Sequence, residues 1–438
     1  MFFRLLRWFY TAVFTLLLPY IFFRLWVRSL RFKGYRRRWA ERLGTIPLPP
    51  LEEVLWVHAV SVGEALAAIP LIHRVREQYP NTPILMTTTT PTGSERVQAA
   101  FKDLLGKQVY HCYLPYDLPW TLNSFFKRIK PKLLVLMETE LWPNLLHACT
   151  QRNLPVLIAN ARLSPKSAKR YGWINYFMRS MIKPIWGVAA QSALDAKRFQ
   201  HLGISPEKVH DTGNIKFDLQ LPSYLTEAGV ELRQEMGKER LVWIAASTHE
   251  GEESAVLTVY ASLKQRFPAL LLLLVPRHPD RFNKVAALCT ERGFKMIRRS
   301  QKQKLNSDTD IFLGDTMGEM PLFYAASDVA FVGGSFVPVG GHNLLEPAAL
   351  GLPVLTGPQL FNFVAISELL INAKGATIVQ NEQALEQELV RLLENAHLRH
   401  SQGKLAKAVV EENRGALDRL VNLIDAVWKK EPVLVSRN

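Results

Sequence analysis

Strand-length apolar runs alternate with helical stretches twice along this chain of 438 residues. In the first half the apolar runs occupy residues 54–60, 84–90, 133–137, 156–159 and 187–190. In the second half they occupy residues 241–246, 270–275, 311–313, 329–332 and 353–355. Continuous apolar runs separated by helices are typical of buried parallel strands in βαβ units. The pattern predicts an α/β fold of two doubly wound, Rossmann-like domains that face each other across a cleft, with ligands at the carboxyl ends of the strands.

Shifts in composition divide the chain into four segments. Residues 1–45 combine an apolar helix with a basic collar, and three prolines in residues 46–50 mark a linker to the body. Residues 219–240 are polar and mixed, so we expect one domain over residues 46–218 and a second over residues 219–400. The helical pattern of residues 401–429 predicts that the last segment, 401–438, is a helix that packs back on the first domain.

The positive charge is concentrated at the amino terminus. Of a net charge of +15, residues 1–42 carry +9, because they hold ten Lys or Arg residues and a single acid, Glu41. A nucleic-acid-binding protein usually spreads its basic surface over the folded body. Here the excess flanks an apolar segment, so the sequence favours an anionic lipid surface as partner over nucleic acid.

Residues 8–23 contain no charge. Sixteen residues fall short of the ~20 that a straight span needs, although Arg7 and Arg24 could snorkel toward the headgroups. The segment predicts a membrane anchor, either a short span, which is favoured, or an interfacial helix. The alternatives are a cleaved signal, for which no suitable site follows, and a buried helix, which the ten basic residues oppose. The arginine-rich run after it favours a cytoplasmic body.

Metal and disulfide chemistry have little support in the sequence. The three cysteines, Cys112, Cys149 and Cys289, are widely spaced, which indicates a reducing compartment without a disulfide framework. Asp308 and Asp310 form a DxD pattern, but they precede an apolar run instead of following one. We therefore interpret them as a loop and expect neither a catalytic metal nor a cofactor.

The stretch GGSFVPVGGHNLLEP, residues 333–347, has the character of a nucleotide-sugar site. It joins an apolar run to a helical segment, and its glycines allow a ligand to approach the backbone. The N–H groups of a helix start could bind phosphate, and Glu346 could accept hydrogen bonds from a ribose. The alternative is structural, because Asn343 and Glu346 have the spacing of a capping box.

Candidate catalytic residues follow strands of the first half. Glu64, in HAVSVGE, could act as a general base, although Ser61 and Glu64 also have the spacing of a capping box; the two roles are compatible. In METELWPN, Glu138 is favoured over Glu140, since alternate side chains of an extended chain point to opposite sides. Lys216, in TGNIKFD, could balance the charge of an anionic donor, or it could be a solvated lysine.

Two loops of the second half could bind phosphate or a base. Pro276 and Arg277 begin VPRHPDRF after a strand, where two cations, Arg277 and His278, suit a phosphate. In GDTMGEM, Gly318 and Glu319 open a helix whose N–H groups are available. A rigid, solvated loop is the alternative interpretation of the first segment.

Taken together, these motifs resemble the family of 3-deoxy-D-manno-oct-2-ulosonic acid (Kdo) transferases of lipopolysaccharide synthesis. The resemblance rests on HAVSVGE, TTTTPTGSERV, LPYDLP, METELWPN, IANARLS, TGNIKFD, STHEGEE, LVPRHPDRF, GDTMGE and FVGGSFVPVGGHNLLEPA. It implies the two-domain GT-B glycosyltransferase fold, with acceptor bound by the first domain and CMP-sugar by the second. It implies CMP-Kdo as donor, a lipid A precursor as acceptor, and a location on the cytoplasmic side of the inner membrane.

The resemblance also implies roles for individual residues. Glu64 would be the proton acceptor, and Glu138 and Lys216 would stabilise the transition state. The CMP site would comprise Pro276, Arg277, Met317, Gly318, Glu319, Asn343, Leu344, Leu345 and Glu346. A single displacement at the anomeric carbon would invert its configuration.

Three other functions remain open from the sequence. One is a GT-B transferase or epimerase that uses a UDP-sugar. Another is a membrane-bound scaffold or lipid-binding protein with a degenerate nucleotide fold, for which Glu64 would be dispensable. A nucleic-acid-binding protein is a distant third, because only +6 of the charge lies outside residues 1–42. The number of Kdo residues added does not follow from the sequence.

Overall fold

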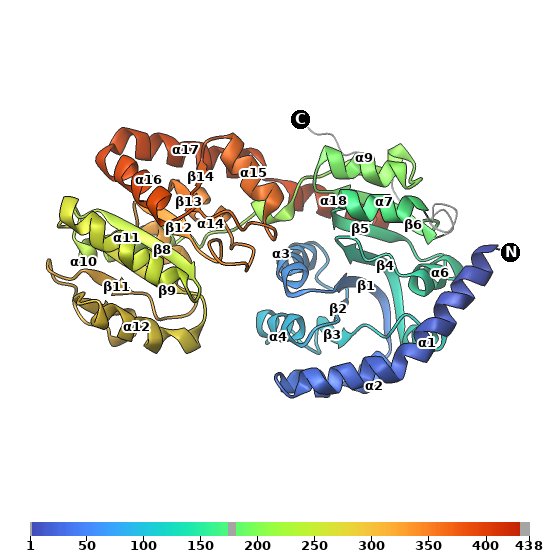
Figure 1. Cartoon of the computed structure of the whole chain (residues 1–438). Helices are drawn as coiled ribbons and strands as arrows, with labels where there is room; N and C mark the ends of the chain where they lie inside the picture. The colour runs from blue at the N-terminus through green and yellow to red at the C-terminus, as the bar shows by residue number, and fades with distance from the viewer. Residues whose placement is uncertain (1, 174–180, 430–438) are drawn as a thin grey trace. The chain divides into compact units, whose positions relative to one another are not determined.

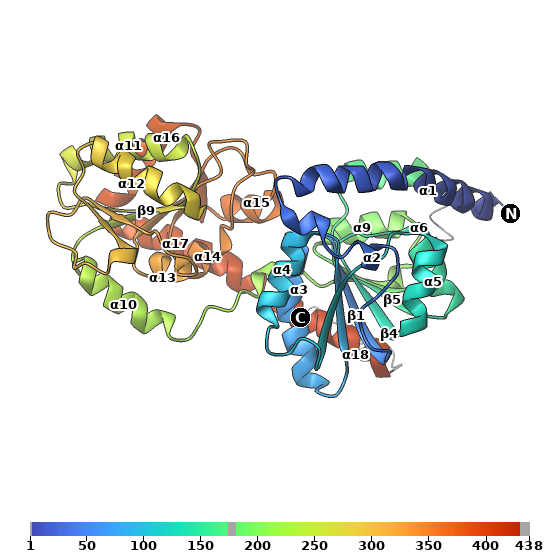
Figure 2. The same ribbon diagram turned by 90° about the horizontal axis from the view of Figure 1, so that it is seen from below.

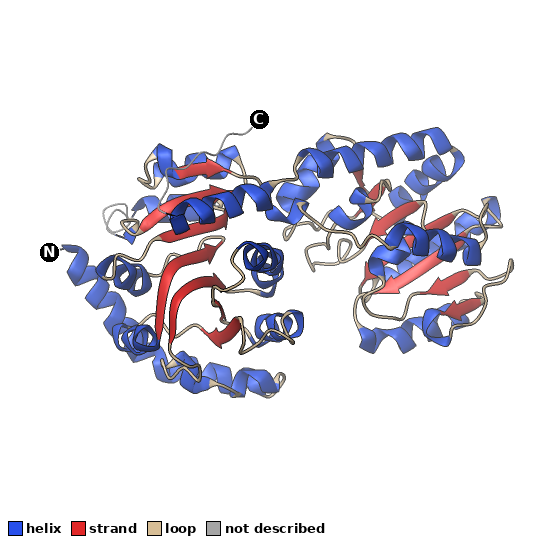
Figure 3. Cartoon of the chain, turned by 180° about the vertical axis from the view of Figure 1, so that it is seen from behind, coloured by secondary structure: helices blue, strands red, loops and turns tan. Residues whose placement is uncertain are grey.

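A computed structural model describes residues 2–173 and 181–429 of the chain. The chain forms two compact units: unit 1 comprises residues 1–218 and 414–438, and unit 2 comprises residues 219–413. Each unit is built on a seven-stranded sheet whose strand pairings are all parallel. Figures 1 and 3 show the helices that cover each sheet. The two doubly wound units expected from the sequence are therefore confirmed, and they have the GT-B class of fold.

The sheet of unit 1 has the strand order β3-β2-β1-β4-β5-β6-β7. Its strands are β1 (Leu51–Ala59), β2 (Ile84–Thr88), β3 (Val109–Tyr113), β4 (Ile129–Met137), β5 (Val156–Ala161), β6 (Ile185–Ala190) and β7 (Val209–Asp211). The order reverses between β1 and β4, because β2 and β3 extend to one side and β5 to β7 to the other. Such a reversal leaves a crevice beyond the carboxyl ends of the two central strands.

Both faces of this sheet are covered. The apolar core on one face includes α5 (Pro119–Arg128), α6 (Pro143–Gln151) and α9 (Ala193–His201). The core on the other face includes α3 (Val62–Gln78), α4 (Pro91–Ala100) and α18 (Ala416–Lys429). Along β1, Trp56 lies in the first core while Leu55 and Val57 lie in the second, as the two-residue period of a strand requires. The other α-helices among the described residues of unit 1 are α1 (Phe2–Ser29), α2 (Trp39–Arg42) and α7 (Pro165–Trp173).

The sheet of unit 2 has the order β10-β11-β9-β8-β12-β13-β14 and reverses between β8 and β12. Its strands are β8 (Val242–Thr248), β9 (Leu271–Pro276), β10 (Met296–Arg298), β11 (Ile311–Leu313), β12 (Val329–Val332), β13 (Val354–Thr356) and β14 (Ala376–Ile378). Its helices are α10 (Leu225–Met236), α11 (Glu252–Arg266), α12 (Phe282–Glu291), α13 (Met320–Ala325), α14 (Leu345–Ala349), α15 (Val364–Asn372), α16 (Glu382–Glu394) and α17 (Ala396–Glu412). The core on one face includes α11, α12 and α16, and the core on the other includes α10 and α13.

The sequence predicts one helix from residue 401 to 429, but the structure has two, α17 and α18. The helices are separated at Gly415, whose φ of +85° favours glycine. Helix α17 stays with unit 2 because small residues let it pack closely: a Cβ on Gly403 would lie 1.9 Å from the carbonyl oxygen of Gly351. Helix α18 belongs to unit 1, where the carboxylate of Asp218 accepts hydrogen bonds from the backbone N–H groups of Gly415 and Leu417, both at 2.6 Å.

Candidate active site

The candidate acids of unit 1 follow its two central strands. Glu64 lies at the start of α3, after β1, and Glu138 directly follows β4. Strands β1 and β4 are neighbours, and the strand order reverses between them. The charge of Glu64 contributes to raising the pKa of Glu138, and the charges of both contribute to raising the pKa of Glu140. The fold thus brings residues 64, 138 and 140 together at the crevice where such sheets bind ligands.

The Glu64 side chain is buried and makes the capping box that its spacing predicts. Its two carboxylate oxygens accept hydrogen bonds from the backbone N–H groups of Val60 at 2.8 Å and Ser61 at 3.1 Å, and the Ser61 hydroxyl caps the N–H of Glu64 at 3.2 Å. A carboxylate has about four lone-pair directions. These two bonds therefore fix the orientation of the group and leave it able to accept a proton.

Glu138 has a strained backbone and a crowded electrostatic setting. Its φ is +56°, a left-handed conformation that few residues other than glycine adopt. Burial and the nearby charge of Glu64 raise the pKa of Glu138, and the positive charges of Lys216 and Arg162 oppose that rise. Two acids and two cations from four different loops therefore share one small region of unit 1.

Glu140 has a different partner. Its carboxylate accepts a hydrogen bond from the Trp142 indole N–H at 2.7 Å. Burial, together with the charges of Glu64 and Glu138, raises the pKa of Glu140 to about 7, and the hydrogen bond from Trp142 opposes this rise. The two acids thus differ in environment: Glu138 lies near cations, and Glu140 accepts a hydrogen bond from an indole.

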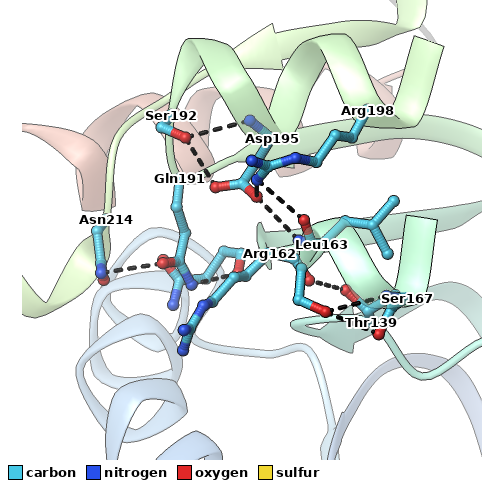
Figure 4. Close-up of polar contacts among 11 residues, drawn as sticks. Thr139, Arg162, Leu163, Ser167, Gln191, Ser192, Asp195, Arg198 and Asn214 are labelled. Carbon is cyan, nitrogen blue, oxygen red and sulfur yellow. Dashed lines mark hydrogen bonds and ion pairs between the residues drawn. The ribbon is translucent and has the colours of Figure 1, made fainter. Parts of the chain in front are cut away.

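A chain of side-chain amides holds the turn that carries Lys216. The Asn160 side-chain oxygen accepts the N–H of Ile215 at 3.1 Å, and that of Asn214 accepts the N–H of Lys216 at 3.0 Å. Gln191 joins the two, because it accepts a hydrogen bond from Asn214 at 3.1 Å and donates one to the Asn160 carbonyl at 2.8 Å. Figure 4 shows the contact between Gln191 and Asn214 beside Arg162. Asn160 lies near the end of β5, and Gln191 and Asn214 follow β6 and β7; the sequence gives no local signal for their role.

The glycine-rich loop of unit 2 is held by a buried acid. Glu252, at the start of α11, accepts hydrogen bonds from the backbone N–H groups of Gly334 at 2.7 Å and of Ser335 and Phe336 at 2.9 Å. It also accepts the N–H of His249 at 2.9 Å. The first N–H groups of the loop therefore face Glu252. The loop follows β12 and Glu252 follows β8, so both lie where the strand order of this sheet reverses.

Gly334 is required in this loop. Its φ is +67°, and an added Cβ would lie 2.8 Å from the ring of His342. The His342 ring stacks on that of His249 with an interplanar angle of 8°. Their Nε2 atoms are 2.7 Å apart, so one Nε2 donates a hydrogen bond to the other. Burial, together with His249, Arg277 and His278, lowers the pKa of His342 to about 4. This stacked pair was not predicted from the sequence.

Asn343 and Glu346 contact each other, but they do not form a capping box. The Asn343 side chain accepts the N–H of Leu345 at 3.1 Å and donates to the Glu346 carboxylate at 3.1 Å. Burial raises the pKa of Glu346, opposed by the bond from Asn343 and by the charge of Arg277. Arg277, which directly follows β9, therefore lies near the start of α14. Leu344 and Leu345 are buried, so their side chains pack in the core and only their backbone could contact a ligand.

Met317, Gly318 and Glu319 follow β11, next to β9 in the sheet. The Glu319 carboxylate forms an ion pair with Arg299 at 2.8 Å. Gly318 has a φ of +88°, and nothing lies within 4 Å of the position of an added Cβ. Helix α13 begins directly after Glu319, and the charge of Glu346 influences Tyr324 within it. The segment is therefore linked to the Asn343–Glu346 turn through α13.

The DxD acids form ion pairs with lysines, Asp308 with Lys295 at 2.9 Å and Asp310 with Lys264 at 2.8 Å. Within residues 2–173 and 181–429, no group of three or more His, Cys, Asp or Glu side chains is arranged to hold a metal ion.

Comparisons with known proteins cover nearly the whole chain. Residues 37–219 match the family model of 3-deoxy-D-manno-octulosonic-acid transferase (kdotransferase), and residues 232–409 match that of glycosyl transferases group 1. The 3-deoxy-D-manno-octulosonic acid transferase of Haemophilus influenzae is 45% identical over 422 residues, 95% of this chain and 98% of the relative. The relative of the same name from Bordetella pertussis is 35% identical over 95% of this chain and 98% of its own length.

Among solved structures, UDP-GlcNAc 2-epimerase from Neisseria meningitidis, bound to UDP-GlcNAc, covers 86% of this chain with a TM-score of 0.57. At 14% sequence identity, this likeness concerns the fold alone.

Proposed function

This chain belongs to the 3-deoxy-D-manno-octulosonic acid (Kdo) transferase family, and on that premise we propose that it moves Kdo from CMP-Kdo to the glucosamine disaccharide of a lipid A precursor, with inversion of configuration. The family makes it a glycosyltransferase of lipopolysaccharide synthesis. The donor, the acceptor and the stereochemistry are the proposal. One observation carries it: Glu64, Glu138 and Lys216, from three separate segments of unit 1, share one electrostatic environment.

In the proposed reaction, a primary hydroxyl oxygen of the acceptor attacks the anomeric carbon of Kdo. The bond from that carbon to the phosphate oxygen of CMP breaks, and CMP leaves with the bonding electrons. The hydroxyl proton passes to the Glu64 carboxylate, which its two backbone N–H donors hold in a fixed orientation. General base catalysis of this kind typically contributes ~10²–10⁴-fold in rate.

Glu138 and Lys216 have supporting roles in the proposal. Lys216 supplies a positive charge for the phosphate that leaves, and preorganised charge of this kind stabilises transition states. Glu138 keeps that lysine in place and faces the positive charge that develops on the sugar ring. Because the amides of Asn160 and Asn214 fix the backbone around residue 216, Lys216 needs little reorganisation during the reaction.

Unit 2 would bind the CMP moiety of the donor. Arg277 is the cation for the phosphate, and Asn343 and Glu346 offer an amide and a carboxylate for the ribose and base. Pro276 and the backbone of residues 317–319 and 344–345 complete the proposed site. The ion pair between Glu319 and Arg299 holds residues 317–319 in place. We therefore assign Glu319 a contact with the nucleotide through its backbone.

The acceptor is a membrane lipid, and helix α1 suits that location. Residues 3–29 are long and apolar enough to cross a membrane by length and composition. We propose that this helix anchors the enzyme to the inner membrane, with the two units on the cytoplasmic side. The basic residues of segment 1–42 would then contact anionic lipid headgroups.

Mass spectrometry of the product tests the proposal. The purified full chain is incubated with CMP-Kdo and a tetra-acylated lipid A precursor, and separately with UDP-N-acetylglucosamine and the same acceptor. We expect the acceptor to gain the mass of one or more Kdo residues only in the first reaction. Transfer from the UDP-sugar, or calorimetric preference for UDP over CMP, would replace this account with that of a UDP-sugar enzyme.

A further inference from the structure

Helix α1 contacts the body of unit 1 along nearly its whole length. The positions that are buried or half-buried recur every three or four residues, from the first turn to the last. They are Phe3, Leu6, Arg7, Tyr10, Thr11, Phe14, Leu18, Ile21, Phe22, Leu25 and Ser29. This is the spacing of one continuous face of a helix. Figures 1 and 2 show α1 lying against unit 1 in two views.

Polar contacts fix the first half of the helix. The Arg7 guanidinium donates to the Asn144 side-chain oxygen at 3.0 Å, and the Asn144 amide donates to the Thr11 hydroxyl at 3.0 Å. Asn144 is itself held, since its backbone N–H and its amide donate to Asp117 at 3.0 and 2.7 Å. All four residues are buried, and breaking buried polar contacts is costly. Arg7 and Thr11 are therefore built into the body of unit 1.

Aromatic contacts hold the helix at both ends and in the middle. Phe3 lies against His147 with a centroid distance of 6.2 Å. Phe14 and Phe22 both contact Tyr116 at 5.9 Å, and Phe22 also contacts Trp39 at 4.9 Å. Helix α1 is thus attached to other elements of unit 1 from Phe3 to Phe22, about five turns, which a helix surrounded by lipid would not be.

The opposite face of α1 is apolar and exposed. Its middle line consists of Leu5, Phe9, Leu16, Tyr20, Phe23 and Val27, which are between 43% and 80% exposed. With about 100° of rotation per residue, Arg24 lies roughly 75° from the centre of this line, and Arg4 and Arg28 lie more than roughly 100° from it. The arginines therefore flank the apolar face and separate it from the body. An apolar face bordered by cations is the arrangement of a helix that lies in the plane of an anionic membrane surface.

The length of the uncharged segment agrees with this geometry. Between Arg7 and Arg24 lie sixteen residues, which extend about 24 Å as a helix, less than the ~30 Å hydrocarbon core of a bilayer. A straight span would therefore pull charged side chains toward the lipid. It would also require α1 to leave the body, or the body surface around Asn144 and Tyr116 to enter the bilayer with it.

We propose that α1 does not cross the membrane but lies in its plane, with the face from Leu5 to Val27 embedded in an anionic bilayer and the opposite face packed on unit 1. The proposal rests on the membrane anchoring put forward above, and it is independent of the reaction catalysed. Its consequence is a fixed orientation of unit 1, since a helix docked along its length holds the body at one angle to the lipid surface.

Depth measurement with spin labels tests this proposal. The three native cysteines are buried, so single cysteines can be introduced at Leu5, Leu16 and Val27 of the full chain and labelled selectively. These positions are exposed, so no core side chain is replaced. In vesicles of phosphatidylethanolamine and phosphatidylglycerol, oxygen and a nickel chelate report the depth of each label. We expect the same shallow depth, about 5–10 Å, at all three positions.

A spanning helix gives another pattern, with the label at residue 16 near the bilayer centre and those at residues 5 and 27 near opposite surfaces. That pattern would overturn the in-plane orientation and leave the anchor intact. Absence of vesicle binding by the unlabelled chain would overturn both the in-plane orientation and the membrane anchor. It would not bear on the proposed Kdo transfer.

A second measurement uses charge. Leu16→Glu should weaken cosedimentation with anionic vesicles by at least tenfold, while Val230→Glu, at an apolar and 55% exposed site in unit 2, should leave it unchanged. Equal binding by the Leu16→Glu variant and the unmodified chain would show that this face does not contact lipid, and would contradict the proposal.

Discussion

The side-chain oxygen of Asn160 accepts a hydrogen bond from the backbone N–H of Ile215 at 3.1 Å, one residue before the proposed catalytic lysine. Asn160 is buried and has a φ of +51°, so strain at the end of β5 is combined with a long-range contact to the turn that carries Lys216. Strain of this kind is kept only where the surrounding structure enforces it. We therefore regard Asn160 as a residue that positions Lys216.

Replacing Asn160 with glycine tests this role without adding backbone strain, because glycine adopts positive φ freely. We expect Asn160→Gly to lower kcat about tenfold or more, the equivalent of ~1.4 kcal/mol in the barrier, while KM for CMP-Kdo stays unchanged. Steady-state kinetics measure both. Asn153→Gly is the matched control, since Asn153 also has a φ of +51° but is exposed. Equal kinetics of the two variants would limit Asn160 to a structural role.

Glu252 should be essential for the shape of the nucleotide loop. It is fully buried and accepts the N–H groups of Gly334, Ser335 and Phe336. Glu252→Gln places an amide N–H₂ against those donors, so we expect ~2–3 kcal/mol loss of stability and at least tenfold weaker CMP binding. Calorimetry of the full chain with CMP measures the affinity. Glu250→Gln serves as control, because Glu250 is 83% exposed and its ion pair with Arg281 is of the weak surface type.

Glu140 should make unit 1 less stable as the pH rises. Its pKa is raised from 4.5 to about 7 in the folded protein, so the folded state keeps the proton that the unfolded chain has already lost. Stability from this group is present below pH 4.5 and is lost as the pH rises to about 7. Glu140→Gln should remove the dependence and raise the thermal midpoint at pH 8 more than at pH 5. Glu77→Gln, at a 62% exposed site, should shift it equally at both.

Four strands were not predicted from the sequence, and all four are edge strands. They are β3 and β7 in unit 1 and β10 and β14 in unit 2. An edge strand is paired on one side only and is often partly exposed, so it needs no continuous apolar run. Residues 209–211 and 296–298, for example, are half-buried throughout. The central strands, which are covered on both faces, are the ones that apolar runs reveal.

The same distinction applies to the residues of the candidate site: local sequence patterns indicate some of them and not others. Glu64, Glu138, Arg277 and the 343–346 turn were singled out because each lies between a predicted strand and the next helix or at the start of that helix, and the carboxyl ends of parallel strands meet at one edge. Asn160, Glu252 and the stacked pair His249 and His342 were not singled out from the sequence. Their roles depend on contacts with distant residues, such as the 2.7 Å bond from Gly334 to Glu252, and no local pattern indicates such a contact.

The proposed proton transfer to Glu64 can be separated from its capping role. Glutamine retains one oxygen for the N–H group of Ser61, as in a capping box, but it sets an amide N–H₂ against the N–H group of Val60 and cannot take up a proton. Glu64→Gln should therefore remain folded, with a loss of about 1–3 kcal/mol of stability from the unpaired N–H group of Val60. As a control, Ser61→Ala removes the cap, costs about 1 kcal/mol of stability and leaves the carboxylate in place.

The most direct measurement is single-turnover transfer from CMP-Kdo to the lipid A precursor, followed by mass spectrometry, in the unmodified chain and in Glu64→Gln at saturating donor. The account predicts that Glu64→Gln binds CMP with unchanged affinity and transfers Kdo ~10²–10⁴-fold more slowly. A Glu64→Gln enzyme that is folded, binds CMP and transfers Kdo at the unmodified rate would contradict it.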